Sequence, residues 1–159
     1  MLLDLTTDER DLTGLRARQK NGAAARGALV RPEGKPLQDL EAGEKLHIVA
    51  ERDGARIAGA TPAELVTLLA RLGLPKEVRQ IHLIVDDSGT GGDESYAARF
   101  SEALAAEGFS VKEIKAPRGR VRWDEEGKVH VFADEQWQPS NAELNTYAGP
   151  DVAEKHRRP

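Results

Sequence analysis

Hydrophobic positions in the middle of the chain form two kinds of pattern. Residues 46–50 and 81–85 are almost continuously apolar, which is typical of strands covered on both faces. Between them, leucines recur at spacings of three and four, which predicts one apolar stripe on a helix. The stripe consists of Leu65, Leu68, Leu69 and Leu72. This part of the chain therefore predicts a strand, a helix and a second strand.

Polar and small residues mark where the predicted helices begin and end. Thr61, Pro62 and Glu64 match a capping box with proline in the first turn, and Gly73 matches a helix stop. A second helix is predicted over residues 94–107, with a third strand over 109–114. Crossover helices make such strands parallel. We therefore predict an α/β three-layer sandwich, with a mostly parallel central sheet and helices on both faces.

A β-hairpin is predicted after the third strand. Residues 121–123 and 129–132 flank a polar loop that contains glycine. We predict an α/β domain over residues 41–141, an N-terminal extension over 1–40 that packs on it, and a C-terminal tail over 142–159. Within the extension, Thr6 and Glu9 match a second capping box.

Composition excludes several kinds of chemistry. The 159 residues include no cysteine, so disulfides, thiolate metal ligands and thiol nucleophiles are absent. The net charge of -4 does not favour binding to nucleic acid or to an anionic membrane. No basic, apolar leader and no stretch of about 20 apolar residues is visible. We expect a cytoplasmic protein, or one exported without a Sec signal.

Two acidic residues follow the predicted strands directly. Glu51 comes after residues 46–50, and Asp86 comes after residues 81–85. Sites in open α/β sheets form beyond the carboxyl ends of parallel strands. Two carboxylates close together there hold a proton more tightly, which suits a general acid. The alternative is that both are solvated loop carboxylates, since strand-end loops are normally polar.

Other residues are weaker candidates for a functional site. Asp87 and Asp93 are oxygen ligands suited to Mg²⁺ or Ca²⁺, but their spacing is not that of an EF-hand. The alternative is a glycine-rich turn held by aspartate side chains. His47 and His82 lie inside strands, and we expect them to be packed. No histidine pair has zinc-ligand spacing.

The stretch from Gly43 to Asn141 resembles the self-processing cysteine-protease domain of MARTX and large clostridial toxins. The resemblance rests on the segments EKLHIVAERD, IAGATPAELVTLLARLGL, RQIHLIVDDSG, SYAARFSEALAAEGFSVKEIKAP and GRVRWDEEGKVHVFADEQWQ, in this order. It implies a caspase-like (clan CD) fold in which the hairpin is a β-flap, and a bacterial toxin or effector context.

The departures from the family matter as much as the matches. The resemblance places the catalytic histidine at Glu51 and the catalytic cysteine at Asp86, so both chemical groups are missing. A carboxylate is a poor replacement for a thiolate that attacks an amide. We therefore expect a pseudo-protease that works as a binding or regulatory module. The alternatives are a hydrolase that uses Glu51 and Asp86, with or without a divalent metal, and a stand-alone adaptor subunit.

The hairpin region carries the candidate binding residues. Large aromatic residues are frequent at protein interfaces, so Trp123 and Trp137 predict a protein partner. The resemblance implies inositol hexakisphosphate as a ligand of basic residues such as Arg118, Arg120 and Lys128. The alternative for these charges is a solvated edge hairpin, in which they discourage edge pairing. Otherwise we expect no cofactor, and the oligomeric state stays open.

Overall fold

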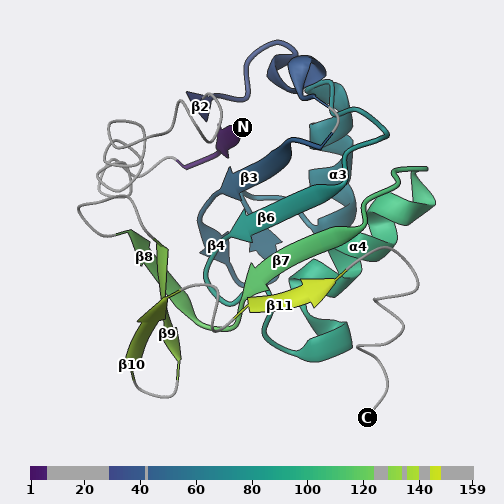
Figure 1. Ribbon diagram of the computed structural model, residues 1–159. Helices are drawn as coiled ribbons and strands as arrows, with labels where there is room; N and C mark the ends of the chain where they lie inside the picture. Colours follow the sequence, from purple (N-terminus) through teal and green to yellow (C-terminus); the bar gives the residue numbers. More distant parts are fainter. Residues whose placement is uncertain (7–28, 42, 124–128, 134–135, 140–143, 148–159) are drawn as a thin grey trace.

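A six-stranded sheet forms the centre of the computed structural model, which describes residues 1–6, 29–41, 43–123, 129–133, 136–139 and 144–147 (Figure 1). Five strands are parallel, and the strand at one edge is antiparallel to its neighbour. Across the sheet the order is β2 (Leu29–Val30), β1 (Leu2–Asp4), β3 (Lys45–Val49), β6 (Gln80–Ile84), β7 (Glu113–Pro117) and β11 (Leu144–Tyr147). The predicted α/β class with a mostly parallel sheet is confirmed.

The two crossover helices lie together against one face of the sheet. Helix α3 (Pro62–Arg71) joins β3 to β6, helix α4 (Tyr96–Ala106) joins β6 to β7, and the helices contact each other. The expectation of helices on both faces is therefore not met within the described residues. The reason is handedness. Right-handed crossovers that step in the same direction across a sheet place their helices on the same face.

The opposite face of the sheet packs against a small second sheet. Its strands are β8 (Arg120–Trp123), β9 (Val129–Ala133) and β10 (Gln136–Pro139), all antiparallel, in the order β10-β9-β8. Val121 and Val129 from this small sheet pack against an apolar cluster on the central sheet. That cluster contains Leu2, Val49 and Ile84. The predicted hairpin is confirmed, and the small sheet lies beside the carboxyl ends of the parallel strands (Figure 1).

Alternation along the strands explains the two faces. Leu46, Ile48, Ile81 and Leu83 point toward the helices and are completely or almost completely buried. Each such side chain contributes about 1.5–3 kcal/mol relative to an exposed position. The remaining short elements are β4 (Arg52–Asp53), β5 (Arg56–Ile57) and the 3₁₀ turns Pro36–Asp39 and Gly92–Glu94.

The predicted start of α3 is confirmed in detail. The backbone N–H of Glu64 donates to the Thr61 hydroxyl at 3.3 Å, and the Glu64 carboxylate accepts from the Thr61 backbone N–H at 3.0 Å. The chain leaves the helix through Gly73, whose φ of +93° favours glycine. Ser95 caps the start of helix α4, because its hydroxyl accepts from the backbone N–H of Ala98.

Several strands differ from the sequence-based prediction. Strands β1 and β2 come from residues 1–40, which were assigned to an extension, and β11 comes from residues 142–159, which were assigned to a tail. The third core strand, β7, lies later than the predicted 109–114. The apolar residues Phe109 and Val111 are buried in the connection that precedes it. Residue 9 of the predicted Thr6–Glu9 capping box lies outside the described residues.

Candidate functional site

The carboxyl ends of the parallel strands bring the two predicted carboxylates to one edge of the sheet. Strands β3 and β6 are adjacent and parallel, with Val49 paired to Ile84. Glu51 and Asp86 each lie two residues beyond that pair, and both are exposed. The predicted juxtaposition on neighbouring strands is confirmed. Whether this pair has any chemistry depends on what each carboxylate contacts.

Asp86 holds the small sheet in place. Its Oδ1 accepts a hydrogen bond from the backbone N–H of Val121 in β8, at 2.8 Å. The backbone N–H of the next residue, Asp87, donates to the carbonyl oxygen of Gly119 at 2.8 Å. The loop after β6 therefore runs beside β8 and satisfies backbone groups on its edge. Asp86 thus has a structural role that its position in the sequence did not predict.

Two glycines permit this close approach. A Cβ atom at Gly119 would lie 2.1 Å from the carbonyl oxygen of Phe132, and one at Gly89 would lie 2.4 Å from that of Ala116. Real side chains essentially never come so close, so only glycine fits at either position. The Gly89 N–H also donates to the carbonyl oxygen of Pro117 at 2.8 Å. The loop after β6 is therefore packed tightly onto β7.

A side-chain hydrogen bond inside the same loop matches the predicted turn. The hydroxyl of Thr90 donates to the Asp87 carboxylate at 3.0 Å, and Asp87 has a positive φ of 54°. Aspartate tolerates this conformation better than most residues. Among the described residues, no three His, Asp or Glu side chains could together hold a metal ion. The structure thus gives no described metal centre around Asp87 and Asp93.

Arg52 is a site residue that the sequence analysis missed. It begins strand β4, directly after Glu51, and its guanidinium group donates to the backbone carbonyls of Asp86 and Asp87. Its Nε also donates to the carbonyl oxygen of Gly54 at 2.9 Å. A fixed positive charge therefore lies at the edge that carries the two predicted carboxylates. The signal available in the sequence was a cation directly beside a strand-end acid.

Asp4 is a further acidic residue at this edge, and the sequence did not single it out. It ends β1, pairs with Val49 in the register, and is only 2% exposed. Its carboxylate accepts from the backbone N–H of Thr6 at 2.9 Å and from the Thr6 hydroxyl at 2.6 Å. Arg31 forms an ion pair with it at 2.5 Å. These bonds satisfy the buried charge and tie residues 4–6 to the chain beyond β2.

Tyr96 links the start of helix α4 to the segment that precedes helix α3. It lies at the start of α4, is buried, and its hydroxyl donates to the carbonyl oxygen of Ala60 at 2.9 Å. Burial raises the pKa of Tyr96 well above its ordinary value, and the charge of Glu64 adds to this effect. The phenol therefore stays protonated at physiological pH and serves as a hydrogen-bond donor.

The two strand histidines lie on the face of the sheet opposite the helices. His47 and His82 are register partners on β3 and β6, and their ring centroids are 5.4 Å apart. His82 is buried, as the sequence analysis expected. Lys115 on β7 is the next residue in the same row, so three basic side chains cross the sheet at one level.

The hairpin residues proposed for binding are placed only in part. Arg118 and Arg120 are exposed, and the Arg120 guanidinium lies 5.1 Å from the centre of the Phe132 ring. Trp123 ends β8, and Trp137 pairs with Phe132, but the side chains of both tryptophans lie outside the described part of the structure. Lys128 also lies outside it. Their proposed role stays a prediction.

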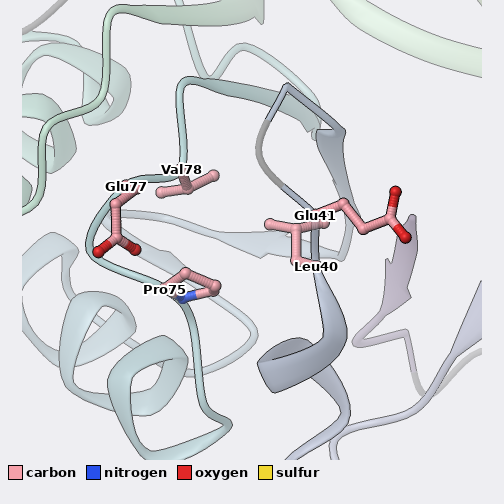
Figure 2. A pocket seen from close by; sticks show the side chains of 5 residues that line it. All are labelled: Leu40, Glu41, Pro75, Glu77 and Val78. Atoms are coloured by element: carbon pink, nitrogen blue, oxygen red, sulfur yellow. The ribbon is translucent and has the colours of Figure 1, made fainter.

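A small pocket lies at the other edge of the sheet (Figure 2). Leu40, Glu41, Pro75, Glu77 and Val78 line it, just before β3 and β6, and its volume is about 160 Å³. Figure 2 shows the carboxylates of Glu41 and Glu77 pointing away from the hollow, so its walls are mainly apolar. Ligand pockets for small molecules are usually about 300–1,000 Å³. This hollow is therefore not a candidate active site.

Comparisons add no family to this description. No protein-family model matches the chain, and a search of curated proteins finds no match. No helix among the described residues is long and apolar enough to span a membrane. The functional argument therefore rests on the geometry of the carboxyl edge and of the small sheet.

Proposed function

We propose that this chain is a catalytically inactive, caspase-like domain that works as a binding or regulatory module. One observation carries the proposal. Asp86 occupies the position where the resembled cysteine proteases have their nucleophile, and its side chain here accepts the Val121 N–H. A residue that attaches the small sheet to the central sheet has a structural task in place of a chemical one.

The surrounding residues support the same conclusion. The chain contains no cysteine, and the position of the catalytic histidine is Glu51. Thiol proteolysis requires a thiolate and an imidazole that activates it; the chain has no thiol, and the position matched to the histidine carries a carboxylate. Arg52 donates to the backbone carbonyl oxygens of Asp86 and Asp87, so its guanidinium group is engaged in holding this loop.

The proposed binding surface is the small sheet and the loops beside it. Loops at strand ends are the adaptable part of an α/β scaffold, so they keep a surface after catalysis is lost. Trp123 and Trp137 belong to this sheet, and tryptophan is among the residues most frequent in binding hot spots. The proposed partner is a protein. The bacterial toxin or effector setting follows from the resemblance alone.

Capture of a partner from the native host tests the proposal. Wild-type protein and a Trp123→Ala variant are used as baits, and the thermal melt of each is recorded. We expect a partner that the variant loses while its melting temperature stays unchanged. A large drop in melting temperature without any Trp123-dependent partner would show that Trp123 is core, and the interface would then be abandoned.

A hydrolase is the second candidate function, because one observation favours it. Glu51 and Asp86 follow adjacent parallel strands and lie at the same edge. Such a pair could divide the roles of general acid and general base. The hydrogen bond from Val121 to Asp86 weighs against this role, because it commits one carboxylate oxygen to the backbone of β8.

A further inference from the structure

Two segments that are distant in sequence meet just before β3 and β6 and line the hollow of about 160 Å³ (Figure 2). Leu40 and Val78, which are buried, and Pro75, which is half-buried, line its apolar part. Glu41 and Glu77 complete the described lining, and both are exposed. We call this site the amino-edge hollow. It presents an apolar surface beside two acidic residues.

Backbone hydrogen bonds hold the two segments of the hollow in place. The N–H of Leu37 donates to the carbonyl oxygen of Leu72 at 3.0 Å, which ties the 3₁₀ turn before β3 to the end of α3. The N–H of Leu40 donates to the carbonyl oxygen of Leu37 at 3.1 Å, and that of Val78 donates to Pro75 at 3.2 Å. The amino-edge hollow is therefore a formed feature of the fold, as most ligand sites are.

Both charged residues of the hollow are acidic. Figure 2 shows their carboxylates on opposite sides of the hollow, pointing outward. Lys76 is next to Glu77 in the sequence, but its ammonium group donates to the carbonyl oxygen of Glu107 and lies 4.0 Å from the centre of the Phe109 ring. Within the described part of the chain, neither carboxylate of the hollow forms an ion pair. The amino-edge hollow thus combines an apolar wall with a negative rim.

We infer that the amino-edge hollow receives one lysine side chain of a protein partner. The apolar stem of lysine lies on Leu40, Pro75 and Val78, while its ammonium group stays in water at the negative rim. The volume is about half that of the smallest usual pockets for small molecules, which suits a single side chain. Lysine fits this rim better than arginine. Two carboxylates that point apart attract a compact ammonium group from both sides, but they do not match the rigid fork of a guanidinium.

This contact adds a second site to the binding surface proposed for the small sheet. The small sheet lies beside the carboxyl ends of the parallel strands, whereas the hollow lies just before β3 and β6. An exposed ion pair contributes little, so a single lysine binds weakly and works as one contact of a larger protein interface. Because the two surfaces lie at opposite edges of the central sheet, each can be tested without the other.

Titration with short peptides, followed by heteronuclear NMR, tests the inference. The peptides have blocked termini and glycine at every position except the centre. The central residue is lysine, norleucine, which has the apolar stem without the charge, or diaminopropionic acid, which has the charge without the stem. We expect the lysine peptide to shift the amide signals of Glu41, Glu77 and Val78 at millimolar concentration. It should bind about threefold more tightly than either of the others.

Matched variants separate recognition from folding. Glu41→Gln with Glu77→Gln removes both charges of the rim, so it should weaken binding of the lysine peptide about threefold and leave binding of the norleucine peptide unchanged. Asp53→Asn with Glu94→Gln removes the same charge from exposed positions outside the hollow and should leave both unchanged. Thermal melts identify any variant that has lost its fold, and the comparison of the peptides on wild type then provides the test.

Three results would overturn the inference. Equal binding of the norleucine peptide would leave no role for the rim charges, and equal binding of the diaminopropionic acid peptide would leave no role for the apolar wall. The third is the absence of shifts at the hollow at about 10 mM lysine peptide. The proposed function has a separate fate. Absence of a Trp123-dependent partner would contradict the small-sheet surface alone, and Trp123→Ala should bind the lysine peptide as wild type does.

Discussion

Asp86 shows how one residue can fit two opposite interpretations. Its place directly after a buried strand is where an α/β fold positions reactive groups, but a solvated loop carboxylate is the commoner outcome at such a position. The hydrogen bond to the Val121 N–H gives it a definite task, since an unsatisfied backbone donor on β8 would cost free energy. Asp4 has a comparable task on β1, where Thr6 and Arg31 surround its carboxylate.

Substitution of Asp86 should loosen the small sheet. Asp86→Ala removes the acceptor of the Val121 N–H, so we expect a loss of about 0.5–1.5 kcal/mol in the free energy of unfolding. Asp86→Asn keeps an acceptor oxygen, so its free energy of unfolding should fall less. Chemical denaturation measures both values. Equal stability of Asp86→Ala and wild type would show that the hydrogen bond does not hold β8.

Substitution of Gly119 should be more damaging. The added methyl group of Gly119→Ala would meet the Phe132 carbonyl oxygen at 2.1 Å, so β8 and β9 must separate. We expect a loss of about 1–3 kcal/mol, with faster hydrogen exchange of amides in β8 and β9. Gly92→Ala is the control, because its φ is +61° but its added Cβ meets nothing within 4 Å. A larger effect at Gly92 than at Gly119 would contradict the packing described.

At the scale of elements, motifs formed by residues adjacent in sequence predicted helices and strands reliably. Elements that depend on pairing with distant segments were not predicted. Helix α3 was predictable because its cap, proline and leucine stripe are adjacent in sequence, and the hairpin because its strands flank a glycine-containing turn. Strands β1 and β11 are short, and only their pairing with β3 and β7 identifies them as strands. Arg52 and Asp4 escaped prediction for a similar reason, since their partners lie 35 and 27 residues away along the chain.

The start of α3 should show a defined pH dependence. Hydrogen bonds from the backbone N–H and hydroxyl of Thr61 lower the pKa of Glu64 below 4.5, and Arg56 adds to this effect. A lowered folded-state pKa means that the stabilisation is present above the unfolded value of 4.5 and is lost as pH falls through the folded value. Glu64→Gln should therefore melt below wild type at neutral pH.

The same comparison at acidic pH provides the check. The difference in melting temperature between wild type and Glu64→Gln should shrink as pH falls below 4.5 and through the lowered folded-state pKa of Glu64. Thr61→Ala removes both the acceptor of the Glu64 N–H and the hydroxyl that lowers the Glu64 pKa, so its loss of about 1 kcal/mol at neutral pH should shrink only in part at acidic pH. A Glu64→Gln difference that does not change with pH would contradict the role assigned to the carboxylate.

At the scale of the molecule, the loops at the carboxyl ends of the parallel strands lie together at one edge of the central sheet. The parallel strands end there, and the strand order reverses between β1 and β3, the position at which open α/β sheets usually bind ligands. In this chain the edge is bridged by Arg52 and Asp86, and the small sheet packs beside it. An open α/β scaffold is thus combined with contacts that join the loop after β6 to the small sheet, which agrees with the proposed binding module.

Mass spectrometry of cleavage products tests the central claim most directly. Wild type, Asp86→Asn and Glu51→Gln are each incubated alone and with a mixed peptide library, with and without inositol hexakisphosphate or a divalent metal. Asp86→Asn suits this purpose because it keeps an acceptor for Val121 and changes only the chemistry of the side chain. We predict no self-cleavage and no sequence-specific peptide cleavage by any of the three proteins. Specific cleavage by wild type that both variants lose would contradict the account and establish the carboxylate pair as a catalytic site.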